Sequence, residues 1–214
     1  MAGEKKYGMF VDLDLCIGCK ACEIACRQEH DLRPRVGEEL DFRRYGSPFW
    51  IKLNWAGPYG TFPQLSFYFY AEMCAHCDDP PCVDACEPGV MYKRDDGIVL
   101  LDHKNKKCDG CGNCAKACPY PGVIWIDPDT HLAEKCTFCY HRLEDGREPA
   151  CVKHCPMQCL TFGDMNDPNS PISQKLKAPD VQGNLIKIPV PPHMEVVPNV
   201  TYVLRRKQAG HFGS

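Results

Sequence analysis

The stretch Cys108-Asp-Gly-Cys111-Gly-Asn-Cys114-Ala-Lys-Ala-Cys118-Pro119 decides the fold of this chain of 214 residues. Its four cysteines are separated by two, two and three residues. This stretch is group three of four similar groups. The others are group one (Cys16, Cys19, Cys22, Cys26), group two (Cys74, Cys77, Cys82, Cys86) and group four (Cys136, Cys139, Cys151, Cys155). Sixteen of the seventeen cysteines are thereby placed, and Cys159 is left over.

The composition indicates a chain that needs internal staples. Nineteen prolines and seventeen glycines limit regular structure, and cysteine inflates the hydrophobic fraction of 44%. Disulfides explain the cysteines poorly, because their number is odd, they come in fours and no apolar leader precedes Cys16. The net charge of −3 without a basic stripe argues against nucleic-acid binding. No apolar run approaches the ~20 residues that span a bilayer.

The spacing of the cysteines is typical of iron–sulfur proteins. Three thiolates at two-residue spacing reach three corners of a cubane [4Fe–4S] cluster, and the fourth cysteine of such a run ligates a second cluster. Groups one and three have this spacing, whereas groups two and four widen the second gap to four and eleven residues. A zinc-stapled interaction module is the alternative, but structural zinc prefers two Cys-x2-Cys knuckles without a third nearby cysteine. The sequence therefore predicts four [4Fe–4S] clusters on sixteen cysteines.

Short elements are predicted around these groups, in an α+β arrangement. Each Cys-x3-Cys pair predicts a short helix with both sulfurs on one face, and Ser170-Pro171 predicts a further helix start. Pro119 and Pro156 follow the last cysteines of groups three and four, where groups one and two have Arg27 and Glu87. Strands are predicted over Gly8–Leu13, Gly97–Leu101, Val123–Asp127, Leu132–Lys135, Leu160–Gly163 and Thr201–Leu204.

Several residues near the groups have an expected role. Cys159, beside Leu160, is expected to be a small buried apolar residue and not a ligand. His76 is expected to form a hydrogen bond near a cluster and so tune its potential. Lys106, Lys107 and Lys135 could raise cluster potentials, but the favoured interpretation is that they are solvated. No acid–base or nucleophile constellation is present, so no catalytic residue is predicted.

Six stretches carry a resemblance to a known family. They are Phe10-Val-Asp-Leu-Asp-Leu-Cys-Ile-Gly-Cys-Lys-Ala-Cys, Cys74-Ala-His-Cys-Asp-Asp-Pro-Pro-Cys, Tyr92-Lys-Arg-Asp-Asp-Gly-Ile-Val, Lys135-Cys-Thr-Phe-Cys-Tyr-His-Arg-Leu, Pro149-Ala-Cys and Gly163-Asp-Met-Asn-Asp-Pro-Asn-Ser-Pro. Over about residues 7 to 170 the sequence resembles the four-cluster iron–sulfur subunits of molybdopterin oxidoreductases of the dimethyl sulfoxide reductase family. The similarity is greatest to the polysulfide, tetrathionate and arsenate reductase branch.

The resemblance implies tandem two-cluster ferredoxin-like units with crossed ligation. The outer unit would comprise residues 1–30 and 130–170, and the inner unit residues 70–129, with a loop-rich insertion over 31–69 and a C-terminal extension over 171–214. The implied ligand sets are Cys16, Cys19, Cys22 and Cys155; Cys136, Cys139, Cys151 and Cys26; Cys74, Cys77, Cys82 and Cys118; and Cys108, Cys111, Cys114 and Cys86.

The resemblance also implies partners and a role. The protein would relay electrons between a quinone-side or soluble partner and a large molybdopterin subunit that holds molybdenum or tungsten. A membrane quinone-reactive subunit is a further expected partner. The location would be peripheral to the membrane, either periplasmic by export with the partner or cytoplasmic. The alternative within the same chemistry is a polyferredoxin subunit of a cytoplasmic hydrogenase or of a tungsten aldehyde oxidoreductase complex.

Overall fold

The structure, a computed structural model, describes residues 4–32, 49–186 and 196–205. The insertion predicted over 31–69 and the extension predicted over 171–214 therefore lie partly outside the described residues. The strands are β1 (Tyr7–Asp12), β2 (Ile51–Tyr59), β3 (Ser66–Met73), β4 (Met91–Lys93), β5 (Val99–Leu101), β6 (Ile124–Ile126), β7 (Ala133–Lys135), β8 (Leu160–Asp164), β9 (Leu185–Ile186) and β10 (Val200–Val203). The helices are α1 (Ala21–Glu29), α3 (Pro81–Asp84), α4 (Asn113–Ala117), α5 (Tyr140–Glu144), α6 (Ala150–Lys153), α7 (Pro171–Lys177) and α8 (Pro179–Gln182).

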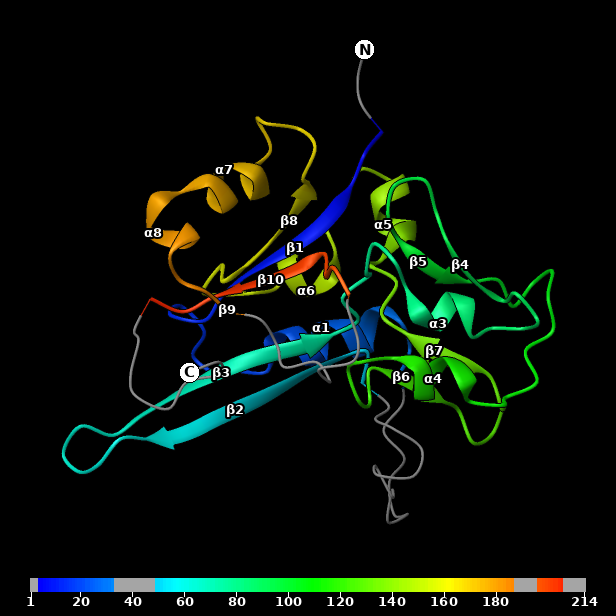
Figure 1. The fold of residues 1–214 in the computed structure, drawn as a ribbon, viewed down its shortest axis with the longest axis horizontal. Coiled ribbons are helices and arrows are strands. Elements are labelled where there is room, and N and C mark those ends of the chain that lie inside the picture. The colour runs from blue at the N-terminus through cyan, green and yellow to red at the C-terminus, as the bar shows by residue number, and fades with distance from the viewer. Residues whose placement is uncertain (1–3, 33–48, 187–195, 206–214) are drawn as a thin grey trace.

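A four-stranded sheet in the order β8-β1-β10-β9 joins segments from both ends of the sequence (Figure 1). Strand β1 pairs antiparallel with β8 and parallel with β10. Side chains alternate between the faces of a strand. Accordingly, Phe10 and Val203 pack with Ile172 and Val181 under α7 and α8, whereas Met9 belongs to the larger core around the cysteine loops. The sheet is therefore buried on both faces.

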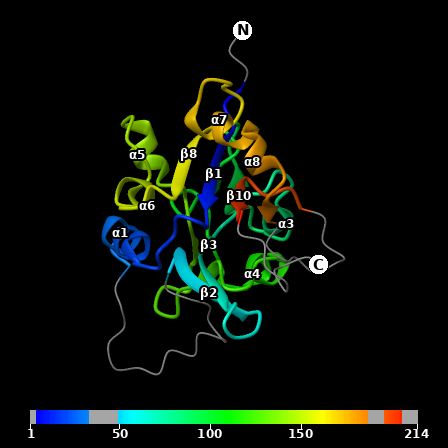
Figure 2. The ribbon, with the colours of Figure 1, turned by 90° about the vertical axis from the view of Figure 1, so that its left-hand side faces the viewer.

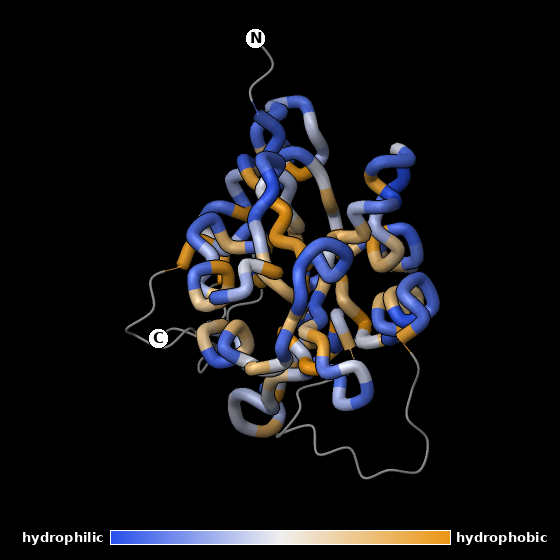
Figure 3. Tube along the Cα trace, turned by 90° about the vertical axis from the view of Figure 1, so that its right-hand side faces the viewer, coloured by the Kyte–Doolittle hydropathy of each residue, from blue (hydrophilic) through white to orange (hydrophobic). Residues whose placement is uncertain are grey.

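The rest of the fold consists of two-stranded hairpins and short helices (Figures 1 and 2). Strands β4 and β5 follow group two, and β6 and β7 follow group three. The longer β2–β3 hairpin projects from the body of the molecule (Figure 1). The trace coloured by hydropathy shows apolar stretches towards the middle of the molecule and hydrophilic turns at its outside (Figure 3). The mixed helix and strand content confirms the predicted α+β class.

Two helix pairs connect the cysteine groups. Helix α1 from group one packs against α6 from group four, and α3 from group two packs against α4 from group three. This pairing brings distant cysteine groups together in the order one with four and two with three.

The prediction that each Cys-x3-Cys pair shares one helix face is wrong for three groups. Only α1 contains both cysteines of its pair, Cys22 and Cys26. In the other groups the last cysteine lies beyond the helix end, as Cys118 does with φ −71° and ψ 126°. The residue before a proline is driven away from the helical region, and Cys118 precedes Pro119. The strands predicted from the sequence are all present, and α7 begins after Ser170, whose hydroxyl accepts the Ser173 N–H.

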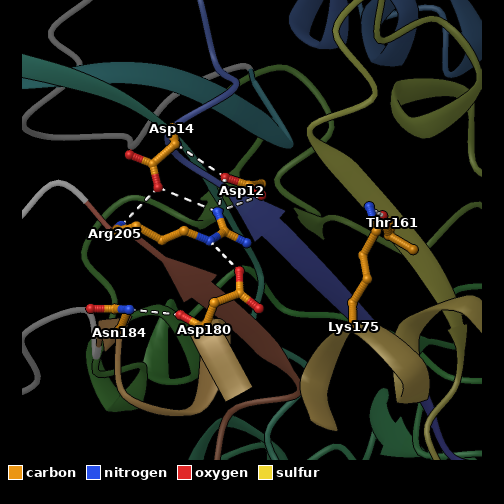
Figure 4. Close-up of polar contacts among 7 residues, drawn as sticks. All are labelled: Asp12, Asp14, Thr161, Lys175, Asp180, Asn184 and Arg205. Atoms are coloured by element: carbon orange, nitrogen blue, oxygen red, sulfur yellow. Dashed lines mark hydrogen bonds and ion pairs between the residues drawn. The ribbon is translucent and has the colours of Figure 1, made fainter. Parts of the chain in front are cut away.

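The segment after β10 is fixed to the loop that leads to the first cysteine group (Figure 4). The guanidinium of Arg205 donates to both carboxylate oxygens of Asp12 at 3.0 and 2.9 Å. It also reaches Asp14 at 3.3 Å and Asp180 at 2.6 Å, so that one side chain connects β1, α8 and the segment after β10. Asp12 is almost fully buried, with 8% of its side chain exposed.

Candidate metal centres

The four Cys-x2-Cys loops share one backbone feature. The residue before the second cysteine has a positive φ in each, at 74° for Gly18, 44° for His76, 69° for Gly110 and 51° for Phe138. This left-handed conformation is easy for glycine and costly for other residues. The repeated conformation therefore belongs to the geometry of the loop rather than to any one sequence.

Group one lines a cavity together with a cysteine from group four. Its walls include Cys16, Cys19, Cys22 and, from far along the sequence, Cys155. Apolar side chains complete the lining, among them Val11, Ile17, Leu53, Met157 and Leu160. These four thiols, together with Cys159, therefore face one space whose other walls are mostly apolar.

Group three lines a second cavity with a cysteine from group two. Here Cys108, Cys111 and Cys114 are joined by Cys86. The apolar lining includes Val90, Met91, Leu101 and Ile126, which come from the hairpins that follow groups two and three. The arrangement repeats that of the first cavity.

The remaining thiols come together in two further sets. Burial raises the pKa of Cys26, and the nearby thiolates of Cys136 and Cys139 raise it further. Burial likewise raises the pKa of Cys118, and the neighbouring Cys74 adds to this effect, as do Cys82 and Cys77. Cys151 lies near the first of these sets, with Cys136 and Cys26 among its charged neighbours.

Several of the buried thiols are poorly suited to ionise without a metal. Burial raises the pKa of Cys22, Cys77 and Cys82 to about 12, and that of Cys114 to about 11. A thiolate ligand in these positions needs positive charge beside it, which the irons of a cluster supply. Among the described residues, no three histidine, cysteine, aspartate or glutamate side chains form a site for a single metal ion. The thiols around the two cavities fit a cubane, whose corners are separated.

Hydrogen bonds reach several sulfurs from their surroundings. The Met91 N–H donates to Cys86 Sγ and the Phe138 N–H to Cys136 Sγ, each at 3.4 Å. His30 Nε2 lies 3.3 Å from Cys139 Sγ, and burial lowers the pKa of this histidine to about 4. His30 could not be predicted from the sequence pattern, because its only local signal is a position four residues after Cys26.

Cys159 is buried, as predicted, with 5% of its surface exposed. Its sulfur lies 3.3 Å from Cys155 Sγ and lines the group-one cavity. A hydrogen bond from Cys159 is the main cause that lowers the pKa of Cys16 to about 6. Cys159 therefore contacts two cysteines that line this cavity, Cys16 and Cys155, although it lies outside the four cysteine groups.

Lys135 contradicts the interpretation that the lysines next to the cysteine groups are solvated. Its side chain is fully buried, and its ammonium group donates to the carbonyl oxygens of Val99 and, at 3.0 Å, of Cys136. Lys106 and Lys107 are exposed, as predicted. His76 is also fully buried, and its Nδ1 accepts the Val99 N–H at 3.0 Å.

The fold and the thiol sets define the class of protein: one that holds [4Fe–4S] clusters in ferredoxin-type loops. Two family models match the sequence. A "4Fe-4S dicluster domain" covers residues 65–165, and a "4Fe-4S binding domain" covers residues 9–29. Together these matches include members of all four cysteine groups.

Known proteins narrow the class. The B subunit of polysulfide reductase from Wolinella succinogenes is 40% identical over 196 residues, covering 91% of this protein and 95% of the relative. Protein NrfC of Escherichia coli K12 is 41% identical over 80% of this protein and 71% of its own length. The B subunit of anaerobic dimethyl sulfoxide reductase from the same organism is 39% identical over 76% of this protein and 75% of the relative.

The protein therefore belongs to the family of iron–sulfur electron-transfer subunits of molybdopterin oxidoreductases of the dimethyl sulfoxide reductase family. Its cofactors are four [4Fe–4S] clusters. In the residues that the structure describes, no helix is both long enough and apolar enough to cross a membrane.

Proposed function

We propose that the protein relays electrons through its four clusters between a quinone-side or soluble partner and a molybdopterin catalytic subunit. The observation that carries this proposal is the crossed composition of the cavities, in which group-one thiols face Cys155 and group-three thiols face Cys86. Crossed ligation places two clusters within one ferredoxin-like unit and so keeps them close. Two such units in series make a path for electrons across the protein.

The proposed ligand sets correspond to the four sets of neighbouring thiols described above. In the outer unit, residues 1–30 and 130–170, the sets are Cys16, Cys19, Cys22 with Cys155, and Cys136, Cys139, Cys151 with Cys26. In the inner unit, residues 70–129, they are Cys74, Cys77, Cys82 with Cys118, and Cys108, Cys111, Cys114 with Cys86. Cys159 is proposed not to be a ligand, because all four corners of its neighbouring cluster already have a thiolate.

The protein contributes positioning, exclusion of water and hydrogen bonds to sulfur. When bound, each cluster supplies a one-electron couple. The apolar walls of the cavities, with Leu53 and Leu160 in the outer unit and Val90 and Met91 in the inner unit, limit the access of water to the sulfurs. The N–H groups of Met91 and Phe138 stabilise charge on Cys86 and Cys136. No bond of a substrate is formed or broken in this role.

The proposed partners follow from the family. The catalytic partner would be a large molybdopterin subunit with molybdenum or tungsten, and a membrane quinone-reactive subunit would complete the path. The protein would then lie peripheral to the membrane, on the side where the catalytic subunit lies. Co-purification from the native source with metal analysis tests this: the large partner should contain molybdenum or tungsten, and a partner with neither metal contradicts the proposal.

Serine variants of the last cysteines test the crossed ligation. In anaerobically purified protein, Cys155→Ser and Cys16→Ser should alter the same cluster signal in electron paramagnetic resonance (EPR) spectra. Cys26→Ser should instead alter the signal that Cys136→Ser alters. If Cys155→Ser and Cys136→Ser changed one signal and Cys16→Ser another, ligation within each group would replace the crossed scheme. A colourless protein that contained zinc in place of iron would contradict the electron-transfer role itself.

A further inference from the structure

The two proposed units meet at a buried contact that we call the junction, formed by His76, Val99, Lys135 and Phe138. His76 lies in the Cys-x2-Cys loop of group two and Phe138 in that of group four. Their rings stack with centroids 3.8 Å apart and an angle of 24° between the planes. The junction therefore connects the loop of an inner ligand set directly to the loop of an outer set.

The backbone at the junction is held in a costly conformation. His76 and Phe138 occupy the loop position at which groups one and three have glycine, and both have a positive φ. Non-glycine residues in this region persist only where their surroundings compensate for the strain. Both side chains are almost fully buried, so the stacked contact between the loops supplies that compensation.

Lys135 places a positive charge at the junction without an acidic partner. It is fully buried, and among the described residues its ammonium group has only the carbonyl oxygens of Val99 and Cys136 as hydrogen-bond partners. Isolated buried charges are strongly disfavoured and need a compensating charge. A cluster with four thiolates is an anion, so the clusters that flank the junction provide that compensation.

The influence of Lys135 extends to both sides of the junction. The ammonium group of Lys135 donates to the carbonyl oxygen of Val99, whose N–H donates to His76 in the group-two loop. Lys135 thereby lies close enough to Cys82 and Cys136 for its charge to act on both. Cys82 belongs to the proposed inner set with Cys118, and Cys136 to the proposed outer set with Cys26. The thiolates of Cys74 and Cys136, one from each set, are themselves close enough to repel each other.

The imidazole of His76 is a further polar group at the junction, and its hydrogen bond with Val99 fixes its tautomer. Because Nδ1 accepts the Val99 N–H, the ring proton lies on Nε2. The ring lies within reach of the Cys136 backbone in the group-four loop. The junction thus places a cation and a buried imidazole between the loops of an inner and an outer thiol set.

We propose that Lys135 raises the reduction potentials of the two clusters that face the junction, and thereby stabilises the electron as it crosses between the inner and outer units. This inference deepens the proposed electron relay and rests on it. The stacked His76 and Phe138 are positioning residues that hold the two loops together around the charge. Lys135 acts through electrostatics and touches no iron.

Charge removal at position 135 tests the proposal in the full-length protein. Lys135→Gln removes the charge and keeps a hydrogen-bond donor, Lys135→Met removes both, and Lys135→Arg keeps the charge. EPR-monitored redox titration of anaerobically purified protein should show lower potentials for two of four clusters in the Gln and Met variants. The Arg variant should retain the native values. The serine variants of the cysteine ligands identify which clusters these are.

Lys107→Met is the matched control. Lys107 precedes the first cysteine of group three as Lys135 precedes that of group four, but it is exposed. Water and salt screen an exposed charge far more than a buried one. This variant should therefore leave all four potentials close to native. A shift as large as that of Lys135→Gln would overturn the inference.

Two further outcomes separate the inference from the proposed function. If Lys135→Gln retains four clusters at unchanged potentials, or shifts all four equally, the junction has no special role while the electron relay stands. If the native protein lacks the clusters, both fail. Should the position-135 variants not assemble, salt titration of the native protein decides: the potentials of the junction clusters should respond less to salt than that of the group-three cluster beside exposed Cys111. An equal response contradicts the proposal.

Discussion

At the scale of single residues, the cysteine loops depend on glycines that no other residue replaces without cost. A Cβ atom at Gly110 would lie 2.6 Å from the His131 carbonyl oxygen, and Gly110 has a φ of +69°. At Gly18, whose φ is +74°, a Cβ would lie 2.8 Å from carbons of the Phe69 ring. Both close approach and backbone conformation therefore require glycine.

Gly110→Ala should lower the stability of the protein by about 2 kcal/mol, because the left-handed conformation and the contact with backbone are both unfavourable. The thermal midpoint, followed by circular dichroism, measures this loss, and the iron content should fall with it. Gly146→Ala is the matched control, since Gly146 has a φ of +71° with nothing within 4 Å of the added Cβ. An equal loss in both variants would show that the contact with His131 contributes nothing.

Cys159→Ala should leave the iron content unchanged and lower the potential of the group-one cluster. The reason is that Cys159 donates to Cys16 and contacts Cys155, and a lost donor makes a reduced cluster less favourable. Iron analysis and redox titration check the two parts of this prediction. A loss of about four irons per protein, the content of one cubane, would identify Cys159 as a ligand.

Residue roles were predictable where they depend on spacing and not where they depend on burial. The four groups could be recognised because their spacing is local in sequence. Lys135 and Lys107 have the same local context, a lysine before a cysteine, yet one is buried and the other is exposed. Lys135 donates to the carbonyl oxygen of Val99 on β5, a contact with a residue far away in the sequence that no local pattern indicates.

At the scale of elements, the helices of groups two, three and four are shorter than the cysteine spacing suggests and end before the last cysteine. Helix α1 is the exception, as it continues to Glu29, whose side chain accepts from His141 at 2.8 Å and from Arg142 at 2.7 Å. These contacts connect α1 with α5 and so join group one to group four. In groups three and four, the proline after the last cysteine was a usable signal for the helix end.

Glu29→Gln should destabilise the contact of α1 with α5 by about 1 kcal/mol, a modest value because the carboxylate is partly solvated. The pKa of Glu29 is lowered from 4.5, first by its hydrogen bond with His141. A lowered folded pKa means that the contribution is complete above the unfolded value and is lost as the pH falls through the folded one. The thermal midpoints of the two proteins should therefore differ at pH 7 and converge as the pH falls below the unfolded pKa of 4.5; a constant difference contradicts this.

At the scale of the whole molecule, the sheet closes the fold by joining its two ends. Arg205 fixes this closure through Asp12 and Asp14, which precede Cys16 in the loop that leads to group one. The neighbouring carboxylates raise the pKa of Arg205, with Asp12 as the largest cause, so its charge persists at every accessible pH. The contacts of Arg205 thus also support the loop before Cys16, which leads into the group-one cavity.

Arg205→Ala should lower the thermal midpoint by about 2–4 °C and speed the loss of one cluster in air. The buried carboxylate of Asp12 loses its partner, and the loop before Cys16 loses its tether. Absorbance decay together with calorimetry measures both effects. Lys177→Ala, at an exposed lysine of α7, serves as the control and should change neither the thermal midpoint nor the rate of cluster loss. Cluster loss at the same rate in both variants would show that the contacts of Arg205 do not protect the cluster.

Removal of iron should unfold most of the protein, because the largest core includes many cysteines of the thiol sets. Treatment with chelator and oxidant should abolish the near-ultraviolet circular dichroism and expose the buried aromatic rings. Iron and sulfide under reducing conditions should restore the signal, whereas zinc should not. Native-like spectra in iron-free protein would show that the polypeptide folds on its own.

The ferredoxin-like cysteine loops could be predicted from the sequence more fully than the sheet that joins the ends of the described sequence. The cysteine repeat indicates ferredoxin-like loops locally, and the predicted strands were found. Their partners were not predicted, because the pairing of Met9 with Val200 connects residues that no local pattern relates. The parallel register of β1 with β10 depends on packing under α7 and α8, which is a property of the completed molecule.

The pairing of β1 with β10 also fixes when the protein can mature. During translation, β1 leaves the ribosome long before its neighbour β10 has been made, and Cys155 is likewise absent when the first three thiols of its proposed set emerge. The nascent polypeptide therefore exposes an apolar strand and unfilled thiols for most of its synthesis. In the proposed ligand set, the group-one cluster would be complete only after residue 155 has emerged, late in the synthesis of the polypeptide.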